Sequence, residues 1–167
     1  VDCDLPVPLM RATKVAVCLA ICVVVAAGCG APTPDILGAR DGEFAPCPST
    51  PNCVHTGLRH PEGTRSIYLR AEGGVSLEDL RGVVEAMPRL TIVSVSEGYI
   101  HAVERSRLFR FIDDLELLMA EDRELVVRSA SRLGSGDMGV NARRLDRLRA
   151  ALGEAGLLAP AAPPSSE

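Results

Sequence analysis

The order of hydrophobic patterns predicts an α+β fold, a two-layer sandwich in which two helices pack on one face of an antiparallel sheet of about four to five strands. Two observations lead to this prediction. Short β-branched segments joined by tight turns follow one another between residues 90 and 131, which favours antiparallel pairing. Segments with helical spacing lie on either side of them, at residues 76–88 and 141–156. We expect a single domain over residues 37–156.

Both helices show a start and a stop. In the first, Ser76 and Asp79 resemble a capping box. Hydrophobic residues then recur three or four positions apart until Pro88 stops the helix. In the second, Asn141 is expected to cap a helix that has leucines on one face and ends near Gly156.

The strands are short and form hairpins. Residues 90–96 and 99–105 flank a Glu-Gly turn, so they are expected to pair as one hairpin. Residues 109–119 and 124–131 are expected to form a second hairpin, and residues 66–71 a first short strand. Residues 37–65 are rich in Gly, Pro and polar residues, which predicts an irregular segment.

The first 28 residues are typical of a secretory signal, with Met10 as the expected true start. Two basic residues follow Met10, and the apolar run at residues 15–25 is too short to span a bilayer comfortably. Small residues then precede Cys29, as in the lipobox of bacterial lipoproteins, although Ala26 departs from the usual Leu. We therefore expect Cys29 to be lipidated. An ordinary cleaved signal and an uncleaved membrane anchor are the alternatives.

A signal of this kind predicts an exported protein, anchored in the bacterial cell envelope and facing the periplasm or the exterior. Residues 29–36 would then carry the lipid and form a Pro-containing tether. Residues 157–167 are rich in Pro, Ala and Ser, so we expect a disordered tail.

Cys47 and Cys53 are the two cysteines left in the mature domain, and an even pair in an exported domain predicts a disulfide. A zinc site with His55 and His60 is the alternative. Zinc pairs are usually closer together than these cysteines, and the loop between the pairs is usually longer. A redox dithiol would favour Cys-x-x-Cys spacing.

The composition of the chain limits the kinds of partner that it is expected to bind. The formal net charge is −4 and there is no Trp, so the chain has neither a broad attraction to nucleic acid nor many rings for base stacking. No motif indicates a cofactor. The expected partners are the membrane, through lipid on Cys29, and an unidentified anionic small molecule or envelope protein.

Charged residues gather on the second hairpin and near it. Asp113 shares strand parity with hydrophobic residues, so if that face of the sheet is the core, Asp113 is a buried carboxylate that needs a guanidinium partner, for which Arg128 is the candidate. Together with Arg105 and Arg132 this pair would line a pocket for an acidic ligand. The alternative is a set of cross-strand ion pairs on a solvated face.

The stretch GSGDMG at residues 134–139 follows a strand and precedes a helix, but no second parallel strand follows to complete a dinucleotide site. It favours a weaker anion site near Asp137 and Asn141, or a turn in which one of these two residues caps the helix. A hydrolase that uses Asp113 or Asp137 with Ser129 or His101 is the alternative function.

Three motifs in order, DGEFAPCPSTPNCV, YIHAVERSRLFRFIDDLEL and VRSASRLGSGDMGVNARR, resemble DUF1499, a family of small bacterial and plastid proteins with no assigned activity. The likeness covers most of residues 37–152. Ala142 and Met138 depart from it, since a basic and a larger apolar or aromatic residue are common there. The resemblance brings no reaction with it. It implies the cysteine pair, the two strand acids and a polar run as signature residues: Cys47, Cys53, Asp113, Glu116, Arg128, Ser129, Ser131, Arg132, Gly134, Asp137, Gly139, Asn141 and Arg143.

Overall fold

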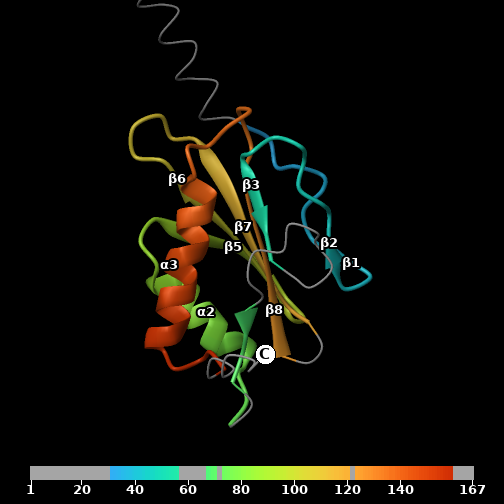
Figure 1. Ribbon diagram of the computed structural model, residues 1–167, viewed down its shortest axis with the longest axis vertical. Coiled ribbons are helices and arrows are strands. Elements are labelled where there is room, and N and C mark those ends of the chain that lie inside the picture. Colours follow the sequence, from blue (N-terminus) through green and yellow to red (C-terminus); the bar gives the residue numbers. More distant parts are fainter. Residues whose placement is uncertain (1–30, 57–66, 71–72, 121–122, 160–167) are drawn as a thin grey trace, which may run out of the picture.

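Two helices cover one face of a twisted antiparallel sheet, and a small two-stranded ribbon lies against the other face (Figure 1). This computed structural model describes residues 31–56, 67–70, 73–120 and 123–159. The elements are β1 (Ala39–Arg40), β2 (Glu43–Phe44), β3 (Cys53–His55), β4 (Ile67–Tyr68), α2 (Leu77–Ala86), β5 (Leu90–Ser96), β6 (Tyr99–Arg105), β7 (Ile112–Met119), β8 (Glu124–Ser131) and α3 (Val140–Glu154).

The main sheet has the order β3-β8-β7-β6-β5, and β4 pairs with the other half of β8. All of these pairings are antiparallel. The α+β fold class predicted from the sequence is therefore confirmed, with six strands in the main sheet. None of the helices in the described part of the chain is long and apolar enough to cross a membrane.

Both predicted hairpins are present. The first joins β5 to β6 through a turn in which Gly98 has a φ of +69°, a conformation that favours glycine. The second joins β7 to β8, with Met119 paired to Leu125 at its closed end. The predicted capping box of α2 is also confirmed, since Ser76 and Asp79 exchange side-chain to backbone hydrogen bonds.

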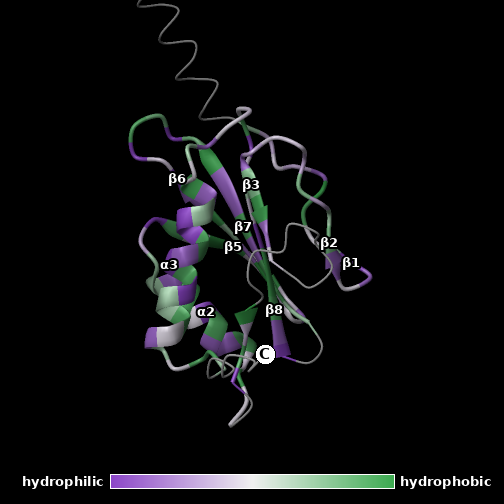
Figure 2. Ribbon diagram, viewed as in Figure 1, coloured by the Kyte–Doolittle hydropathy of each residue, from purple (hydrophilic) through white to green (hydrophobic). Residues whose placement is uncertain are grey.

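The core lies between the sheet and the two helices. Alternate residues of β6, β7 and β8 point toward the helices and meet one hydrophobic face of each helix. In Figure 2 a hydrophilic stretch interrupts the green of the sheet beside the N-terminal turns of α3. The largest hydrophobic side chains of this core that are almost completely buried are Ile67, Leu69, Leu80, Ile100, Leu115, Leu117, Leu125, Leu148 and Leu152.

Three segments differ from the sequence prediction. Residues 37–65 are not wholly irregular, since they contain β1, β2 and β3. The expected tail begins inside the domain, because Leu157 is buried and Leu158 forms a bridge with Leu69. The expected tether is also partly packed, because Ala31 is buried. The signal segment, Cys29 and His60 lie outside the described residues.

Cys47 and Cys53 form a disulfide, as the sequence predicted, and their Cα atoms are 5.6 Å apart. In the disulfide both sulfurs are bonded to each other, so neither thiolate is available to hold zinc. Cys53 is the first residue of β3 and pairs with Ala130 of β8, so the bond ties the preceding loop to the end of the main sheet.

Candidate functional site

Charged side chains lie on both faces of the sheet, near the end of β6 and the start of β7. Neighbouring residues of a strand point to opposite faces. Asp113 therefore points toward α3, whereas Asp114 points toward the N-terminal segment. The result is two separate polar clusters, one on each side of the sheet, which we call the helix-face cluster and the back-face cluster.

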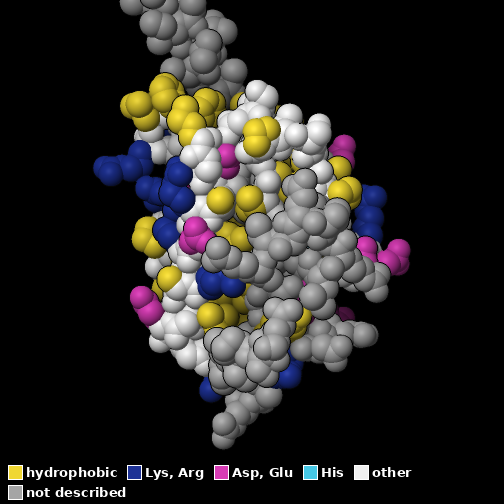
Figure 3. All heavy atoms as spheres, in the orientation of Figure 1, with side chains coloured by type: hydrophobic (Ala, Val, Ile, Leu, Met, Phe, Trp, Pro, Cys, Tyr) yellow, Lys and Arg dark blue, Asp and Glu magenta, His cyan; other side chains and the backbone are white. Residues whose placement is uncertain are grey.

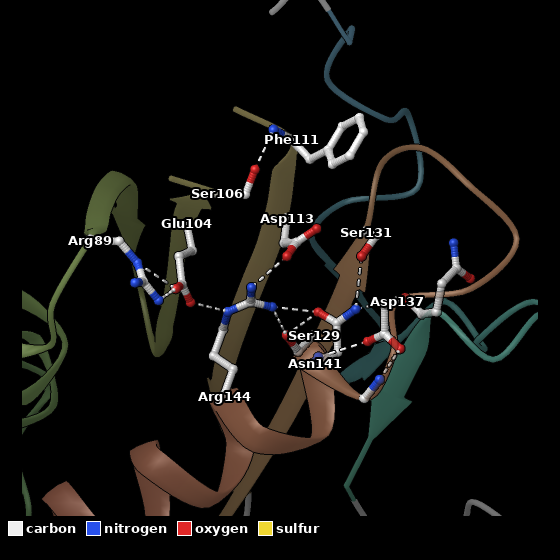
Figure 4. A network of polar contacts seen from close by, with 12 residues as sticks. Arg89, Glu104, Ser106, Phe111, Asp113, Ser129, Ser131, Asp137, Asn141 and Arg144 are labelled. Atoms are coloured by element: carbon white, nitrogen blue, oxygen red, sulfur yellow. Dashed lines mark hydrogen bonds and ion pairs between the residues drawn. The ribbon is translucent and has the colours of Figure 1, made fainter. Parts of the chain in front are cut away.

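The helix-face cluster is centred on Arg144 of α3, whose side chain is 1% exposed (Figure 4). Its Nε lies 2.6 Å from Glu104 Oε2 and its Nη2 lies 2.5 Å from Asp113 Oδ2. Its Nη1 donates to Ser129 Oγ at 2.8 Å and also to Asn141 Oδ1. One guanidinium thus joins β6, β7, β8 and α3, and both buried carboxylates have a cationic partner.

Two further arginines reach Glu104 from the solvent side. Arg89 contacts Oε1 at 2.5 Å and Arg147 contacts Oε2 at 2.8 Å. Burial favours the neutral carboxyl, but the hydrogen bonds from Arg144 and Arg89 outweigh it and hold the pKa of Glu104 below its ordinary value. Glu104 is therefore an ionised carboxylate between three guanidinium groups.

Asn141 ties α3 to the sheet. Its Oδ1 accepts from Ser129 Oγ at 2.8 Å, and its Nδ2 donates to the carbonyl of Asn52 at 2.9 Å and to Ser131 Oγ at 3.0 Å. Asn141 is completely buried. Its amide group is thus occupied on both its donor and acceptor sides, and it links β8 to the residue just before β3.

The expectation that Asn141 caps the second helix is wrong. Gly139 occupies the N-cap position, and no side chain at that position makes a capping bond. Asp137 supplies the missing acceptor instead, since it receives the backbone N–H groups of Asn141 at 2.7 Å and of Gly139 at 2.8 Å. Burial opposes ionisation of Asp137, but these backbone bonds prevail and lower its pKa.

The back-face cluster begins at Asp114, which is buried between His101 and Arg132. His101 Nε2 lies 2.8 Å from Oδ1, and Arg132 contacts both carboxylate oxygens at 2.8 and 2.9 Å. This fork is the strong, bidentate geometry for an arginine and a carboxylate. Burial raises the pKa of Asp114, but the bonds from His101 and Arg132 outweigh it, so the net shift is downward.

Glu116 forms the second half of the back-face cluster. Its Oε2 accepts from Arg128 Nη1 at 2.8 Å, and its Oε1 accepts from the backbone N–H of Gly38 at 2.7 Å and from the Tyr99 hydroxyl at 2.9 Å. Burial, and then the charge and hydrogen bond of Glu116, raise the pKa of Tyr99. Glu116 therefore holds the segment before β1 against the sheet.

Of the two alternatives for Asp113, the structure has the buried carboxylate with a guanidinium partner, but the candidate partner, Arg128, is wrong. Arg128 faces the opposite side of the sheet and pairs with Glu116, while Arg144 holds Asp113. In the register of the sheet Asp113 lies opposite Ser131, and Arg128 lies opposite Glu116. The alternation of side chains along β8 is a sequence signal that Arg128 and Ser129 face opposite sides of the sheet. The sequence does not give the register of β8 against β7, which decides the side that Asp113 shares.

Arg144 and Glu104 are the important residues that sequence reasoning missed. The spacing of α3 contained a signal for Arg144, since it lies between Asn141 and Leu145 on the face that continues to Leu148. A charged residue in the middle of a buried helical stripe indicates a partner in the facing sheet.

The expected ligand residues do not surround one pocket in the described part of the chain. Asp113 and Asn141 meet at Arg144, whereas Arg128 and Arg132 are on the back face and Arg105 is exposed at the end of β6. The hydrolase candidates are also separated, because Ser129 faces α3 and His101 faces the back. A groove of about 700 Å³ lies elsewhere, between α2 and α3, with small residues such as Ala86 and Ala151 in its lining.

Residues 43–152 match the model of a family described as a protein of unknown function, DUF1499. No curated protein matches the chain. The matched range contains every residue of the two clusters apart from Gly38 and the Ala31 and Thr33 contacts of Arg132.

The lowered pKa values of Glu104 and Asp114 predict that the folded protein is less stable in acid. A carboxyl whose pKa is lower in the folded state binds more protons when unfolded, so its stabilisation is complete above the ordinary values of 4.5 and 3.8 and is lost as the pH falls. We expect the free energy of unfolding to decline below about pH 5. Denaturant titrations over a pH series measure this decline. In the Asp114→Asn variant the free energy of unfolding should change less steeply with pH. Stability that increases on acidification would contradict it.

Proposed function

Because this chain belongs to the DUF1499 family, whose function is unknown, we propose a function from its own residues: a membrane-tethered, non-enzymatic domain of the bacterial cell envelope that serves as a binding or scaffold domain for a partner protein. The targeting half of this proposal rests on the sequence. A positive start, an apolar run at residues 15–25 and small residues before Cys29 support export and lipidation. A thiol that is lipidated at Cys29 would leave the domain attached by its first residue.

The pairing of the buried carboxylates with arginines carries the other half of the proposal. Glu104, Asp113, Asp114 and Glu116 are all buried and each is held by at least one arginine at 2.8 Å or less. A catalytic acid or base must be within reach of a substrate proton, and these carboxylates contact protein donors instead. The buried carboxylates of the two clusters therefore support the fold rather than a reaction.

The same observation favours a partner protein over a small anionic ligand. Arg128, Arg132 and Arg144 are the arginines that lie deepest in the clusters, and their guanidinium groups already bind carboxylates. Within the clusters the Nε of Arg128 has no hydrogen-bond partner among the described residues, but an anion at any of the paired guanidinium nitrogens would have to displace a charged hydrogen bond in a buried environment, which is unfavourable. A partner protein needs only exposed surface.

Intact mass spectrometry of protein extracted from membranes in mild detergent tests this proposal. We expect a chain that begins at Cys29 and carries the added mass of acyl groups, with no small anion retained under native conditions. The Cys29→Ser variant is the control and should have no acyl mass. Equal acylation of this variant would contradict the tether. One equivalent of an anion retained by the native protein would contradict the choice of a partner protein over a small ligand.

A further inference from the structure

The loop between β6 and β7, residues 106–111, forms an exposed hydrophobic tip that neither cluster uses. Leu108 is 77% exposed, and Phe109 and Phe111 are about half exposed with ring centroids 5.7 Å apart. The loop is closed by backbone and side-chain bonds between Ser106 and Phe111. Large apolar side chains held outward on a closed loop indicate a surface that something covers.

A further exposed hydrophobic side chain, that of Met138, extends from the neighbouring loop between β8 and α3. Met138 is 95% exposed and has a positive φ of 52°. The two loops leave the same end of the sheet, since β6 ends and β7 begins there and β8 also ends there (Figure 1). Figure 3 shows hydrophobic side chains gathered at this end of the molecule, with Lys or Arg side chains beside them.

The charge of this end differs from that of the whole protein. The tip contains Arg107 and Arg110, both exposed, and no acidic residue. The one acidic residue of the neighbouring loop, Asp137, is occupied by two backbone N–H groups of α3. A basic, apolar tip on a chain with a formal net charge of −4 is suited to an anionic surface.

The chain enters the folded domain at this same end. The carbonyl of Ala31 accepts a hydrogen bond from Arg132 Nη1 at 3.2 Å, and the backbone N–H of Arg132 donates to the carbonyl of Ile112 at 3.1 Å. Ala31 is therefore next to the base of the tip. Cys29 precedes Ala31 by two residues, and two residues span at most about 7 Å.

From this juxtaposition we propose that the tip inserts into the surface of the anionic bilayer that holds the N-terminus. Leu108, Phe109 and Phe111 enter the boundary between headgroups and acyl chains, and Arg107 and Arg110 contact lipid phosphates. The short reach from Cys29 leaves little room for a partner between the tip and the bilayer. A second copy joined through the same end would place these arginines against each other, which is unfavourable.

The inference rests on the proposed tether, and it adds an orientation. The membrane contacts the loop end of the sheet, so the groove between α2 and α3 stays accessible beside it. A domain that is docked at two points, lipid and tip, has a fixed orientation relative to the bilayer, whereas a domain on a lipid alone rotates freely.

The absence of tryptophan makes a direct test possible. Leu108→Trp introduces a single tryptophan in the tip, where the leucine is 77% exposed, and Val93→Trp places one at a hydrophobic position on β5 that is 56% exposed. The full processed lipoprotein is reconstituted into vesicles of phosphatidylcholine with about a quarter phosphatidylglycerol. Lipids brominated near the upper acyl chain then quench any tryptophan within contact distance, and flotation reports whether the protein is attached.

We expect several-fold stronger quenching of Leu108→Trp than of Val93→Trp, and weaker quenching at position 108 after Arg107→Gln and Arg110→Gln are added. Equal quenching at both positions in vesicles that carry the protein would overturn the docking but leave the tether intact. A blue-shifted emission at position 108 that bromine does not quench would mean that protein covers the tip, which also overturns the docking. Protein that does not float with the vesicles would overturn the tether, and the docking with it.

Discussion

Replacing Arg144 with methionine is expected to lower the free energy of unfolding by about 3–5 kcal/mol. The change removes the one guanidinium that contacts both Glu104 and Asp113, while methionine keeps most of the side-chain volume. Asp113 would then have lost its only ion pair among the described residues, and a buried carboxylate without a partner must either be protonated or bring in water. Chemical denaturation followed by circular dichroism measures the loss.

Arg147→Met is the matched control for this prediction. Arg147 is on the same helix and contacts the same oxygen of Glu104, Oε2, at 2.8 Å, but its side chain is 41% exposed. A half-exposed ion pair contributes about 0–1 kcal/mol, so this variant should remain close to the parent protein. Equal losses of stability in the two variants would show that the burial of Arg144 is not the reason for the effect of Arg144→Met.

A compensated variant keeps the prediction testable if Arg144→Met alone does not fold. Adding Glu104→Gln and Asp113→Asn removes the two charges that Arg144 contacts, and each amide has nearly the shape of the carboxylate that it replaces. Neutral replacements of a buried ion network are often tolerated, so the triple variant should recover much of the loss. A triple variant less stable than the single one would contradict the electrostatic explanation.

Glu116→Ala is expected to have an effect of similar size, about 3–5 kcal/mol, on the other side of the sheet. It leaves the Arg128 guanidinium, 3% exposed, without its carboxylate, and it removes the acceptor of the Gly38 N–H and the Tyr99 hydroxyl. We also expect faster hydrogen exchange at the Gly38 amide, because this bond attaches the segment before β1 to β7.

Two companions separate charge from packing at Glu116. Glu85→Ala is the control, since Glu85 pairs with Arg81 on the exposed face of α2 and should contribute less than about 1 kcal/mol. In the second companion, Glu116→Leu is combined with Arg128→Met, so that no buried charge remains and stability should return toward that of the parent. If the charge-free pair is no better than Glu116→Ala, hydrogen bonds to Gly38 and Tyr99 are the main contribution instead.

The stretches with the clearest local signals were predicted most accurately. The capping box at Ser76 determined where α2 begins, and the Glu-Gly turn determined the β5–β6 hairpin, because both depend on residues a few positions apart. The disulfide followed from the cysteine count and the expected compartment. Strand β3 was missed because its three residues show no alternation and form a strand only by pairing with β8.

The helix cap was misassigned for a related reason. Asp137 and Asn141 are both good capping residues, and a sequence does not say which of them lies outside the first turn. The backbone at Gly139 decided it, with a φ of +75° that turns the chain so that Asp137 receives the first free N–H groups. Asn141 thereby became part of the core and took its partners from β8 and from Asn52.

By itself, the sequence predicted an α+β fold with two helices on an antiparallel sheet and a disulfide between Cys47 and Cys53, but it left open whether Asp113 is buried. The tertiary structure decided which charges pair. Strand parity separates Asp113 from Asp114, but the partner of each comes from a helix or strand far along the chain. Pairing depends on the register of β7 against β8 and on the face that α3 presents, and both of these are set by the packing of the whole core.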